Sequence, residues 1–573
     1  MLKTVFSIRT HIVRSSDRIC RRRFSAHFKE QNAYNLAIND EQKEKLVNSY
    51  KSIEDQLFEA LKNENNTISI RKFISALESA GLKDDDPRLK ECFKKISELQ
   101  SSTNPKKRQL LKNGLTKEAF TECVKENIML IRRVFASELV IPEFSEFIDN
   151  VEEIYYNTRA IRQGKVSDYI PQLKKVDPNI WGVSLCTTDG QRHSIGDAKQ
   201  PFCLQAISKP LNYAIALNDV GPEKVHRYIG HEPSGESSNE IKLGINNKPH
   251  NPMINAGAIV NVSLLKTNMS IAGRFDYITQ EYKRLSGNGF LSFNNPSFLS
   301  ERETSYRNYA LGHYLRENKC FPENINLSET LDLYFQLCSS EVTCESASII
   351  AATLANAGIC PITGDKILST VSVQNTLSLM HSCGMYDYSG QWAFHIGLPA
   401  KASIAGAILI VVPNVMGIAL LSPRLDCHGN SVRGVEFSKE LIKLFNFHNY
   451  DSLNQIDRKA NPRRHHHERK GQQTVTLLFG SYKGDVSALT RQYLLDIDMN
   501  QADYDGRTAL HIAAAEGHIE CVEFLVNICK VDLMPKDRWG FTPLDDAIKF
   551  KKSEVRNFLE AKCEELNYSF SNK

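Results

Sequence analysis

Residues 402–423 read ASIAGAILIVVPNVMGIALLSP, and this uncharged stretch decides between a membrane span and a buried sheet. Its 22 residues are long enough to cross a bilayer as a helix. However, Pro413 and Asn414 divide it into two short apolar runs rich in β-branched residues. That pattern is typical of two buried strands joined by a tight turn. We therefore predict a β-hairpin here and no membrane span.

A second hairpin is expected at the start of the same region. Residues 181–186 and 191–195 are apolar or alternating runs on either side of the turn Thr188-Asp189-Gly190. The chain between the two hairpins has mostly helical spacing. We therefore predict an α+β domain over 145–450, with an antiparallel sheet assembled from the two ends of the segment.

Residues 40–135 are predicted to form a small helical, EF-hand-like bundle, because apolar residues recur there at helical spacing. The run Asp84-Asp85-Asp86 could suggest calcium binding. No D-x-[DN]-x-[DN]-G loop follows it, so we expect these carboxylates to cap a helix instead.

The C-terminal part of the chain contains a repeat. Asp503-x-x-Gly506-x-Thr508-x-Leu510 recurs 34 residues later, at 537–544, close to the ankyrin period of about 33. We predict ankyrin repeats over 473–565, preceded by a polar, basic linker at 455–472. Such repeats usually serve protein contacts, so a protein partner is expected.

Residues 1–28 have the composition of a mitochondrial transit peptide, with seven basic residues, one acid and several serines. Arginines at 9 and 14 interrupt any apolar core that a secretory signal would need. We expect cleavage near Phe24 and a location in the mitochondrial matrix. The alternative is a basic arm without a targeting role.

The rest of the composition excludes several classes of protein. The 573 residues are 41% hydrophobic and 24% charged, which is typical of globular domains. Outside the basic leader the chain is close to neutral, so nucleic acid is not an expected partner. Fourteen cysteines occur without any C-x-x-C pair, which indicates reduced thiols rather than a zinc cage or a disulfide framework.

One segment has the spacing of a catalytic pair. Residues 205–210, QAISKP, precede the helical run LNYAIALND. A helix starting here would place positions 206 and 209 on one face, which is the spacing of an S-x-x-K nucleophile and base. Position 206, however, is alanine, while position 209 is lysine.

Several longer motifs resemble one family, the serine-dependent glutaminases. They are FCLQ-x-x-x-KPLNYAIALND (202–219), VHRYIGHEPSG (225–235), KPHNPMINAGAIV (248–260), SERETSYRNYALG (300–312), YFQLCSSEVTCESASIIAATLANAGICPITG (334–364), LMHSCGMYDYSGQWAFHIGLPAKASIAG (379–406) and VVPNVMGIALLSP (411–423). The order of leader, helical domain, catalytic domain and ankyrin tail is similar to that of the animal kidney-type and liver-type mitochondrial glutaminases.

The resemblance implies hydrolysis of L-glutamine to L-glutamate and ammonia on a β-lactamase-like fold. It implies no metal and no cofactor, and it implies tetramers formed through the catalytic domain. Lys209 and Tyr386 would carry protons, with position 206 as the nucleophile. The remaining roles, in substrate binding and oxyanion stabilisation, would fall on Tyr169, Gln205, Asn255, Glu301, Asn308, Tyr334, Tyr386 and the backbone N–H of Ile404. A carboxylate such as Glu301 suits the ammonium of an amino acid, and amide donors suit its carboxylate.

Ala206 is a departure from that pattern, because members of the family carry serine there. Ser208 lies about 200° further around a helix, so it should point away from the pocket. Three readings stay open at this point. The chain hydrolyses glutamine, through Ser208 or through water activated by Lys209 and Tyr386; or it is a pseudoenzyme that binds glutamine or regulates active paralogues; or it hydrolyses another substrate.

Overall fold

The computed structural model describes residues 52–101, 114–235, 239–451, 459–463, 466–494 and 497–565; the predicted transit peptide lies outside these ranges. The chain forms two compact units. Among the described residues, the first unit holds those up to Phe73 and those within Glu91–Phe135, and the second holds Ile74–Lys90 and those from Ala136 onward.

The first unit is a helical bundle closed by aromatic side chains. Phe73 packs edge-on against Phe120, with ring centroids 5.7 Å apart, and stacks on Phe135 at 5.9 Å. An antiparallel bridge joins Ile68 to Leu115. The helices of this N-terminal region are α3 (Ile53–Leu61), α4 (Ile70–Ser79), α5 (Lys90–Ser101), α7 (Lys117–Val124), η2 (Lys125–Asn127) and α8 (Ile128–Phe135).

The Asp84–Asp86 run caps a helix, as predicted. Asp86 precedes the short helix η1 (Pro87–Leu89), and its carboxylate accepts a hydrogen bond from the Arg88 backbone N–H at 3.0 Å. The Arg88 guanidinium in turn donates to the backbone oxygen of Asp189 at 2.6 Å. Within the described ranges, no group of three or more His, Cys, Asp or Glu side chains is placed to hold a metal ion.

The predicted hairpin at 402–423 is confirmed. It consists of β7 (Ala407–Val412) and β8 (Met416–Leu421), which pair antiparallel, with Asn414 at φ +62° in the turn. β8 also pairs with β1 (Gly182–Thr187), so the sheet is built from both ends of the domain, as expected. The full order is β2-β1-β8-β7-β6, where β2 is Arg192–Gly196 and β6 is Ala400–Ala402. None of the described helices is long and apolar enough to cross a membrane.

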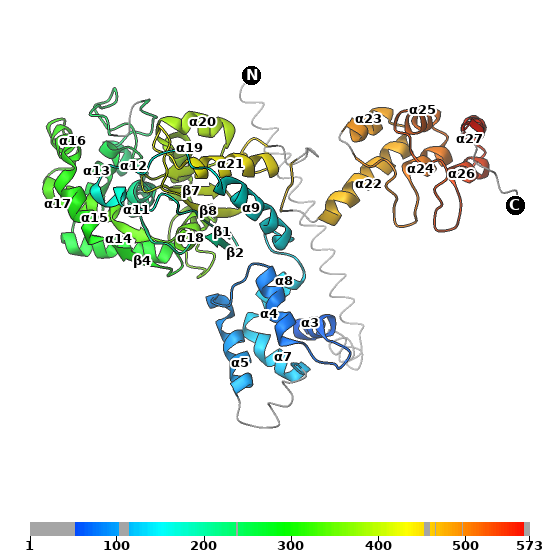
Figure 1. Cartoon of the computed structure of the whole chain (residues 1–573), viewed down its shortest axis with the longest axis horizontal. Coiled ribbons are helices and arrows are strands. Elements are labelled where there is room, and N and C mark those ends of the chain that lie inside the picture. The colour runs from blue at the N-terminus through cyan, green and yellow to red at the C-terminus, as the bar shows by residue number, and fades with distance from the viewer. Residues whose placement is uncertain are drawn as a thin grey trace, which may run out of the picture. The chain divides into compact units, whose positions relative to one another are not determined.

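Both faces of this sheet are covered, which explains the absence of charge in β7 and β8. Ile408 and Ile410 belong to the core that includes α9 (Phe144–Arg159) and α21 (Val432–Leu444), while Leu409 belongs to the core that includes α18 (Cys344–Ala355) (Figure 1). α18 lies very close to β8, because a Cβ atom on Gly417 would stand 2.1 Å from the Ala352 nitrogen. Glycine is therefore required at that crossing.

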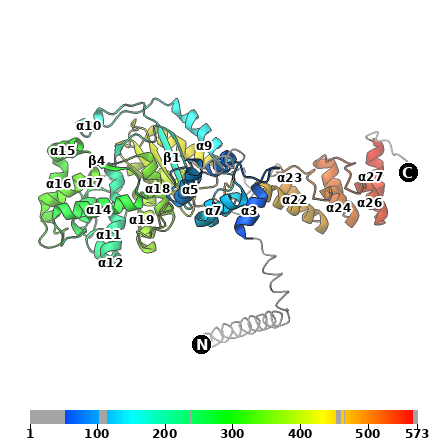
Figure 2. The same ribbon diagram turned by 90° about the horizontal axis from the view of Figure 1, so that it is seen from below.

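Most of the remaining helices gather beyond one side of the sheet (Figure 2), whereas α20 (Ser389–His395) packs into the core that includes α9 and α21. A small second sheet has the order β3-β5-β4, and the chain passes from its strand β3 directly into the candidate site at Gln205. The elements of this region are α10 (Pro171–Lys174), β3 (Phe202–Cys203), η3 (Gln205–Ile207), α11 (Ser208–Val220), α12 (Pro222–Tyr228), α13 (Asn255–Leu264), α14 (Ile271–Leu285), β4 (Leu291–Phe293), α15 (Asn295–Thr304), α16 (Tyr306–Glu317), α17 (Leu327–Cys338), β5 (Ser340–Val342), α19 (Thr370–Cys383), η4 (Tyr386–Tyr388) and α20 (Ser389–His395).

The C-terminal repeat motif forms the same turn twice. The Asp503 carboxylate accepts from the Arg507 N–H at 2.9 Å, and Asp537 accepts from the Phe541 N–H at 2.9 Å. Threonine then begins each following helix, α24 (Ala509–Glu516) and α26 (Pro543–Lys549). The other helices here are α22 (His466–Lys483), α23 (Val486–Leu494), α25 (Ile519–Glu523), η5 (Phe524–Ile528) and α27 (Ser553–Glu565). α22 begins inside the segment 455–472, so the prediction that all of this segment is a linker was wrong.

Candidate functional site

The turn from β3 into α11 places positions 206 and 209 on one wall of a cavity. Ala206 lies in η3 and Lys209 in the first turn of α11, and both line a cavity of about 130 Å³. Gln205 adopts φ +47°, a left-handed backbone that costs a non-glycine residue about 1–3 kcal/mol. Strained backbone of this kind is concentrated at functional sites, and here it directs the Gln205 side chain to the cavity wall.

The cavity brings together residues from distant parts of the domain. All of the residues predicted for the site line it except Asn308, which is buried behind Asn255. Asn239 and Cys338 also line it and were not predicted. The full lining is Tyr169, Gln205, Ala206, Lys209, Asn239, Asn255, Glu301, Tyr334, Cys338, Tyr386 and Ile404.

Glu301 is a buried carboxylate at the cavity wall. It is 1% exposed, and it accepts a hydrogen bond from Gln205 Nε2 at 3.1 Å. Within the described part of the chain, no Lys or Arg forms an ion pair with it. Burial raises the pKa of this carboxyl to about 7, although the Gln205 hydrogen bond and the positive charge of Lys209 oppose the rise. A ligand ammonium would supply the missing positive charge.

A chain of hydrogen bonds connects Lys209 to the solvent side of the cavity. Lys209 Nζ donates to Asn255 Oδ1 at 2.6 Å, Asn255 Nδ2 donates to Asn308 Oδ1 at 2.9 Å, and Asn308 Nδ2 donates to the Tyr169 hydroxyl at 3.0 Å. Tyr169 is 39% exposed. Because each side chain in this series donates to the next, these side chains hold one another in place.

Burial also changes the acid–base behaviour of Lys209. It lowers the pKa of the ammonium to about 8, while nearby Glu301 and Cys338 favour the charged form. A fraction of Lys209 is therefore neutral near physiological pH and can accept a proton.

Tyr386 also lines this cavity. Its backbone is also left-handed, at φ +53°, and its buried hydroxyl has no well-formed hydrogen bond among the described residues. The Ile404 backbone N–H lies near enough to oppose the rise in the Tyr386 pKa that burial causes. The ammonium of Lys401 lies 4.4 Å from the Tyr386 ring centroid and donates to the Ala402 oxygen at 2.8 Å.

Lys401 was not predicted from the sequence, although it is fully buried. Burial and the charge of Lys209 both lower its pKa well below the ordinary value. The sequence did contain a signal of its burial, since Lys401 directly precedes the uncharged stretch 402–423. A lysine inside a buried strand needs a specific environment, which here is the Tyr386 ring.

Ser208 does not line the cavity. Its hydroxyl donates to the Gln205 backbone oxygen at 2.7 Å and lies 3.8 Å from Cys338 Sγ. Its side chain is 1% exposed, so the hydroxyl is already used inside the helix turn. The prediction that it points away from the pocket agrees with this geometry.

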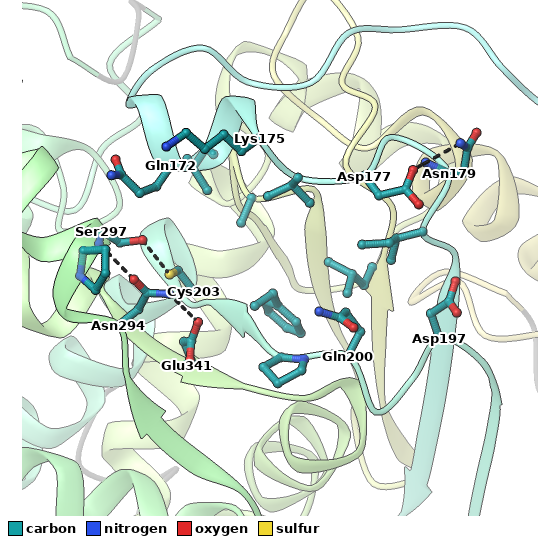
Figure 3. A pocket seen from close by; sticks show the side chains of 18 residues that line it. Gln172, Lys175, Asp177, Asn179, Asp197, Gln200, Cys203, Asn294, Ser297 and Glu341 are labelled. Atoms are coloured by element: carbon teal, nitrogen blue, oxygen red, sulfur yellow. Dashed lines mark hydrogen bonds between the residues drawn. The ribbon is translucent and has the colours of Figure 1, made fainter.

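A larger cavity of about 710 Å³ has a separate lining (Figure 3). Its lining includes Cys203 and Ala405, the chain neighbours of Leu204 and Ile404, and also Asn294, whose amide donates to Glu341 at 2.7 Å. It contains none of the predicted site residues. We therefore place the chemistry in the smaller cavity.

An antiparallel sheet flanked by helices, with a lysine one turn after the nucleophile position, defines a β-lactamase-like hydrolase domain. Comparison with known proteins narrows this class. Residues 164–450 match the Glutaminase family model, 53–142 match an EF-hand domain, and 477–568 match ankyrin repeats in three copies. The chain belongs to the glutaminase family.

Relatives match along most of the chain. The liver isoform of mitochondrial glutaminase from Rattus norvegicus is 52% identical over 507 residues, covering 88% of this chain and 83% of the relative. Putative glutaminase 2 from Caenorhabditis elegans is 48% identical, covering 88% and 85%. Among solved structures, Mglu in its glutamate form has a TM-score of 0.51 at 35% identity, covering 54% of this chain and 71% of that chain. Probable glutaminase ybaS has a TM-score of 0.51 at 34% identity, covering 53% and 98%.

Proposed function

We propose that this chain is a glutaminase whose 130 Å³ cavity binds L-glutamine and hydrolyses its side-chain amide to L-glutamate and ammonia. The observation that carries the proposal is Glu301, a buried carboxylate that forms no ion pair with any described residue, in a cavity of amino-acid size. Such a group binds an ammonium strongly, because the carboxylate is already desolvated in the folded chain and gains the opposite charge that it lacks.

The two ends of the substrate would then contact different groups of residues. The α-ammonium contacts Glu301, and the α-carboxylate accepts from the Asn255 amide and the Tyr169 hydroxyl, which Asn308 holds in place from behind the wall. The side-chain amide extends toward Ala206, Lys209 and Tyr386. The Ile404 N–H would hold the oxygen that becomes negative when the carbonyl is attacked.

Ala206 determines the rate of that reaction. With no hydroxyl at this position, a water molecule must attack the carbonyl carbon and give its proton to neutral Lys209. The C–N bond then breaks, and ammonia leaves with a proton from Tyr386 or Lys209. Loss of a nucleophile typically lowers turnover by a factor on the order of 10⁴ to 10⁶, so we expect slow hydrolysis.

The second candidate function is that of a glutamine-binding protein that regulates active paralogues. The alanine at position 206 favours it, together with the burial of the Ser208 hydroxyl in its own turn. In this case the cavity would bind the amino acid without productive turnover.

Other properties are proposed on the resemblance and on the names of the relatives. We place the chain in the mitochondrial matrix, directed by residues 1–28 with cleavage near Phe24. We also propose a homotetramer formed by the catalytic domain, a protein partner for the ankyrin repeats, and a reaction without metal or cofactor.

The test is ammonia release from L-glutamine by the purified chain lacking residues 1–28, with and without phosphate. Ala206→Ser and Ser208→Ala are measured beside it. Slow release that persists in Ser208→Ala and rises by at least 10⁴ in Ala206→Ser supports the proposal. Release that disappears in Ser208→Ala would make Ser208 the nucleophile. Silence in the unmodified chain, with recovery in Ala206→Ser, would favour the binding protein.

A further inference from the structure

The end of the cavity around Ala206 contains hydrogen-bond donors and few acceptors. Lys209 Nζ has three N–H groups, one of which is used by Asn255 Oδ1. The Tyr386 hydroxyl has no well-formed partner among the described residues, and the Ile404 N–H approaches it. The Ala206 side chain offers neither a donor nor an acceptor, and Cys338 sulfur is at most a weak acceptor.

A carboxamide and a carboxylate differ in what they require at such a place. The amide of L-glutamine brings one oxygen acceptor and two N–H donors, whereas the γ-carboxylate of L-glutamate brings acceptors alone. A serine at 206 would have given the amide nitrogen a hydroxyl oxygen as acceptor. Without it, the Tyr386 hydroxyl oxygen is left as an acceptor for two amide N–H groups, and an N–H without a partner in a buried site is costly.

We propose that this cavity holds L-glutamate in preference to L-glutamine, with the γ-carboxylate between Lys209 Nζ, the Tyr386 hydroxyl and the Ile404 N–H. This inference rests on the proposed function, since it assumes that Glu301 takes the α-ammonium. The alanine then has two effects, because it slows the reaction and it also removes a contact that favours the substrate amide over the product carboxylate. The protein becomes one that retains L-glutamate.

The charges around Lys209 support this assignment. The titratable groups on the cavity wall are Glu301, Cys338 and the tyrosines at 169, 334 and 386, and Lys401 lies behind Tyr386. Glu301 is committed to the ligand ammonium, and burial raises the pKa of Cys338 and Tyr386, so both stay neutral. Lys209, with a pKa lowered to about 8, is left to face the ligand carboxylate. Binding of that carboxylate should raise the Lys209 pKa and take up a proton.

Calorimetric titration of the chain lacking residues 1–28 tests the proposal, with L-glutamate and L-glutamine at pH 7 and pH 8.5 in two buffers of different ionisation enthalpy. We expect L-glutamate to bind at least tenfold tighter at pH 7. At pH 8.5 it should take up about half a proton more than L-glutamine does, because most of Lys209 is neutral there before binding. Lys209→Met should bring the two affinities within about threefold and abolish the difference in proton uptake. Lys224→Met, an exposed lysine of α12, is the matched control and should change neither.

Each other result has a distinct meaning. Equal affinities, or tighter L-glutamine, would overturn the preference while leaving the proposed function in place. Proton uptake that survives Lys209→Met and is lost in Lys401→Met would overturn the assignment to Lys209. Binding of neither ligand by the unmodified chain would overturn the proposed function and this inference together. If Lys209→Met does not fold, as judged by thermal unfolding, Tyr386→Phe replaces it and should weaken L-glutamate more than L-glutamine.

Discussion

The two walls of the small cavity differ in how completely their polar groups are paired. The holding wall is formed by Tyr169, Gln205, Asn255 and Glu301. Gln205 donates to Glu301 at 3.1 Å, and Asn308, buried behind this wall, bonds to Asn255 at 2.9 Å and to Tyr169 at 3.0 Å. On the reacting wall, Ala206 has no polar atom and the Tyr386 hydroxyl lacks a well-formed partner among the described residues. The comparison indicates that the groups that bind the substrate and the groups that react with it are separate parts of this site. Loss of one hydroxyl at position 206 removes the nucleophile and leaves the binding groups in place.

The largest effect is expected on the reacting wall once a nucleophile is restored. In the Ala206→Ser chain, a further Lys209→Met change should lower the recovered turnover by a factor on the order of 10⁴ or more, because the serine loses its base. Steady-state ammonia release measures this, with Lys224→Met as the control. Full activity in the double variant would mean that another group activates the serine.

A change on the holding wall should affect binding rather than chemistry. Glu301→Gln removes the buried charge that faces the ligand ammonium, and we expect L-glutamine affinity to fall by about 10- to 150-fold. Glu303→Gln, an exposed neighbour on α15, is the matched control and should bind normally. Calorimetric titration gives both values. An equal loss in the two variants would show that the helix, and not the carboxylate, is responsible.

The pH dependence of binding tests whether the charged Glu301 carboxylate holds the ligand ammonium. The Glu301 pKa is raised to about 7, so the carboxylate is charged above this pH and becomes protonated below it. Affinity for L-glutamine should therefore fall toward tenfold per pH unit as the pH drops below about 7. Titrations between pH 5.5 and 8 test this, and the Glu301→Gln profile should be flat over that range. A flat profile in the unmodified chain would place the ammonium elsewhere.

The smallest effect is expected behind the holding wall. Asn308→Ala removes the link between Asn255 and Tyr169, and a neutral hydrogen bond of this kind contributes about 0.5–1.5 kcal/mol. L-Glutamine affinity should fall by about 2- to 12-fold, whereas Asn318→Ala, at the end of the same helix, should leave it unchanged. A Kd that does not move in Asn308→Ala would show that this chain of hydrogen bonds does not support the ligand.

Local sequence patterns predicted much of the fold, because the relevant signals are short in range. The interrupted apolar run at 402–423 specified a hairpin, and the repeated Asp-x-x-Gly turns specified the C-terminal helices. The start of α22 at His466 was missed, since a polar, basic segment shows no apolar face to mark a helix.

The site could be predicted only in part from the residues themselves. The spacing of positions 206 and 209 is local and was recognised, whereas Glu301 and Tyr386 were assigned through the family resemblance. Cys338, Asn239 and Lys401 reach the site through tertiary packing of α17, a loop and β6, which no spacing along the chain reveals. Their positions depend on how distant elements meet.

The claim that binding and reaction depend on different groups is tested most directly by measuring turnover and affinity together in the unmodified chain and in Ala206→Ser. Ammonia release gives turnover; titration with L-glutamine for the unmodified chain, and KM for the variant, report affinity. We predict that turnover rises by at least 10⁴ while affinity changes by no more than about tenfold. Failure to recover turnover, or failure of the unmodified chain to bind L-glutamine at all, would contradict the account, because the decay would then extend beyond one hydroxyl.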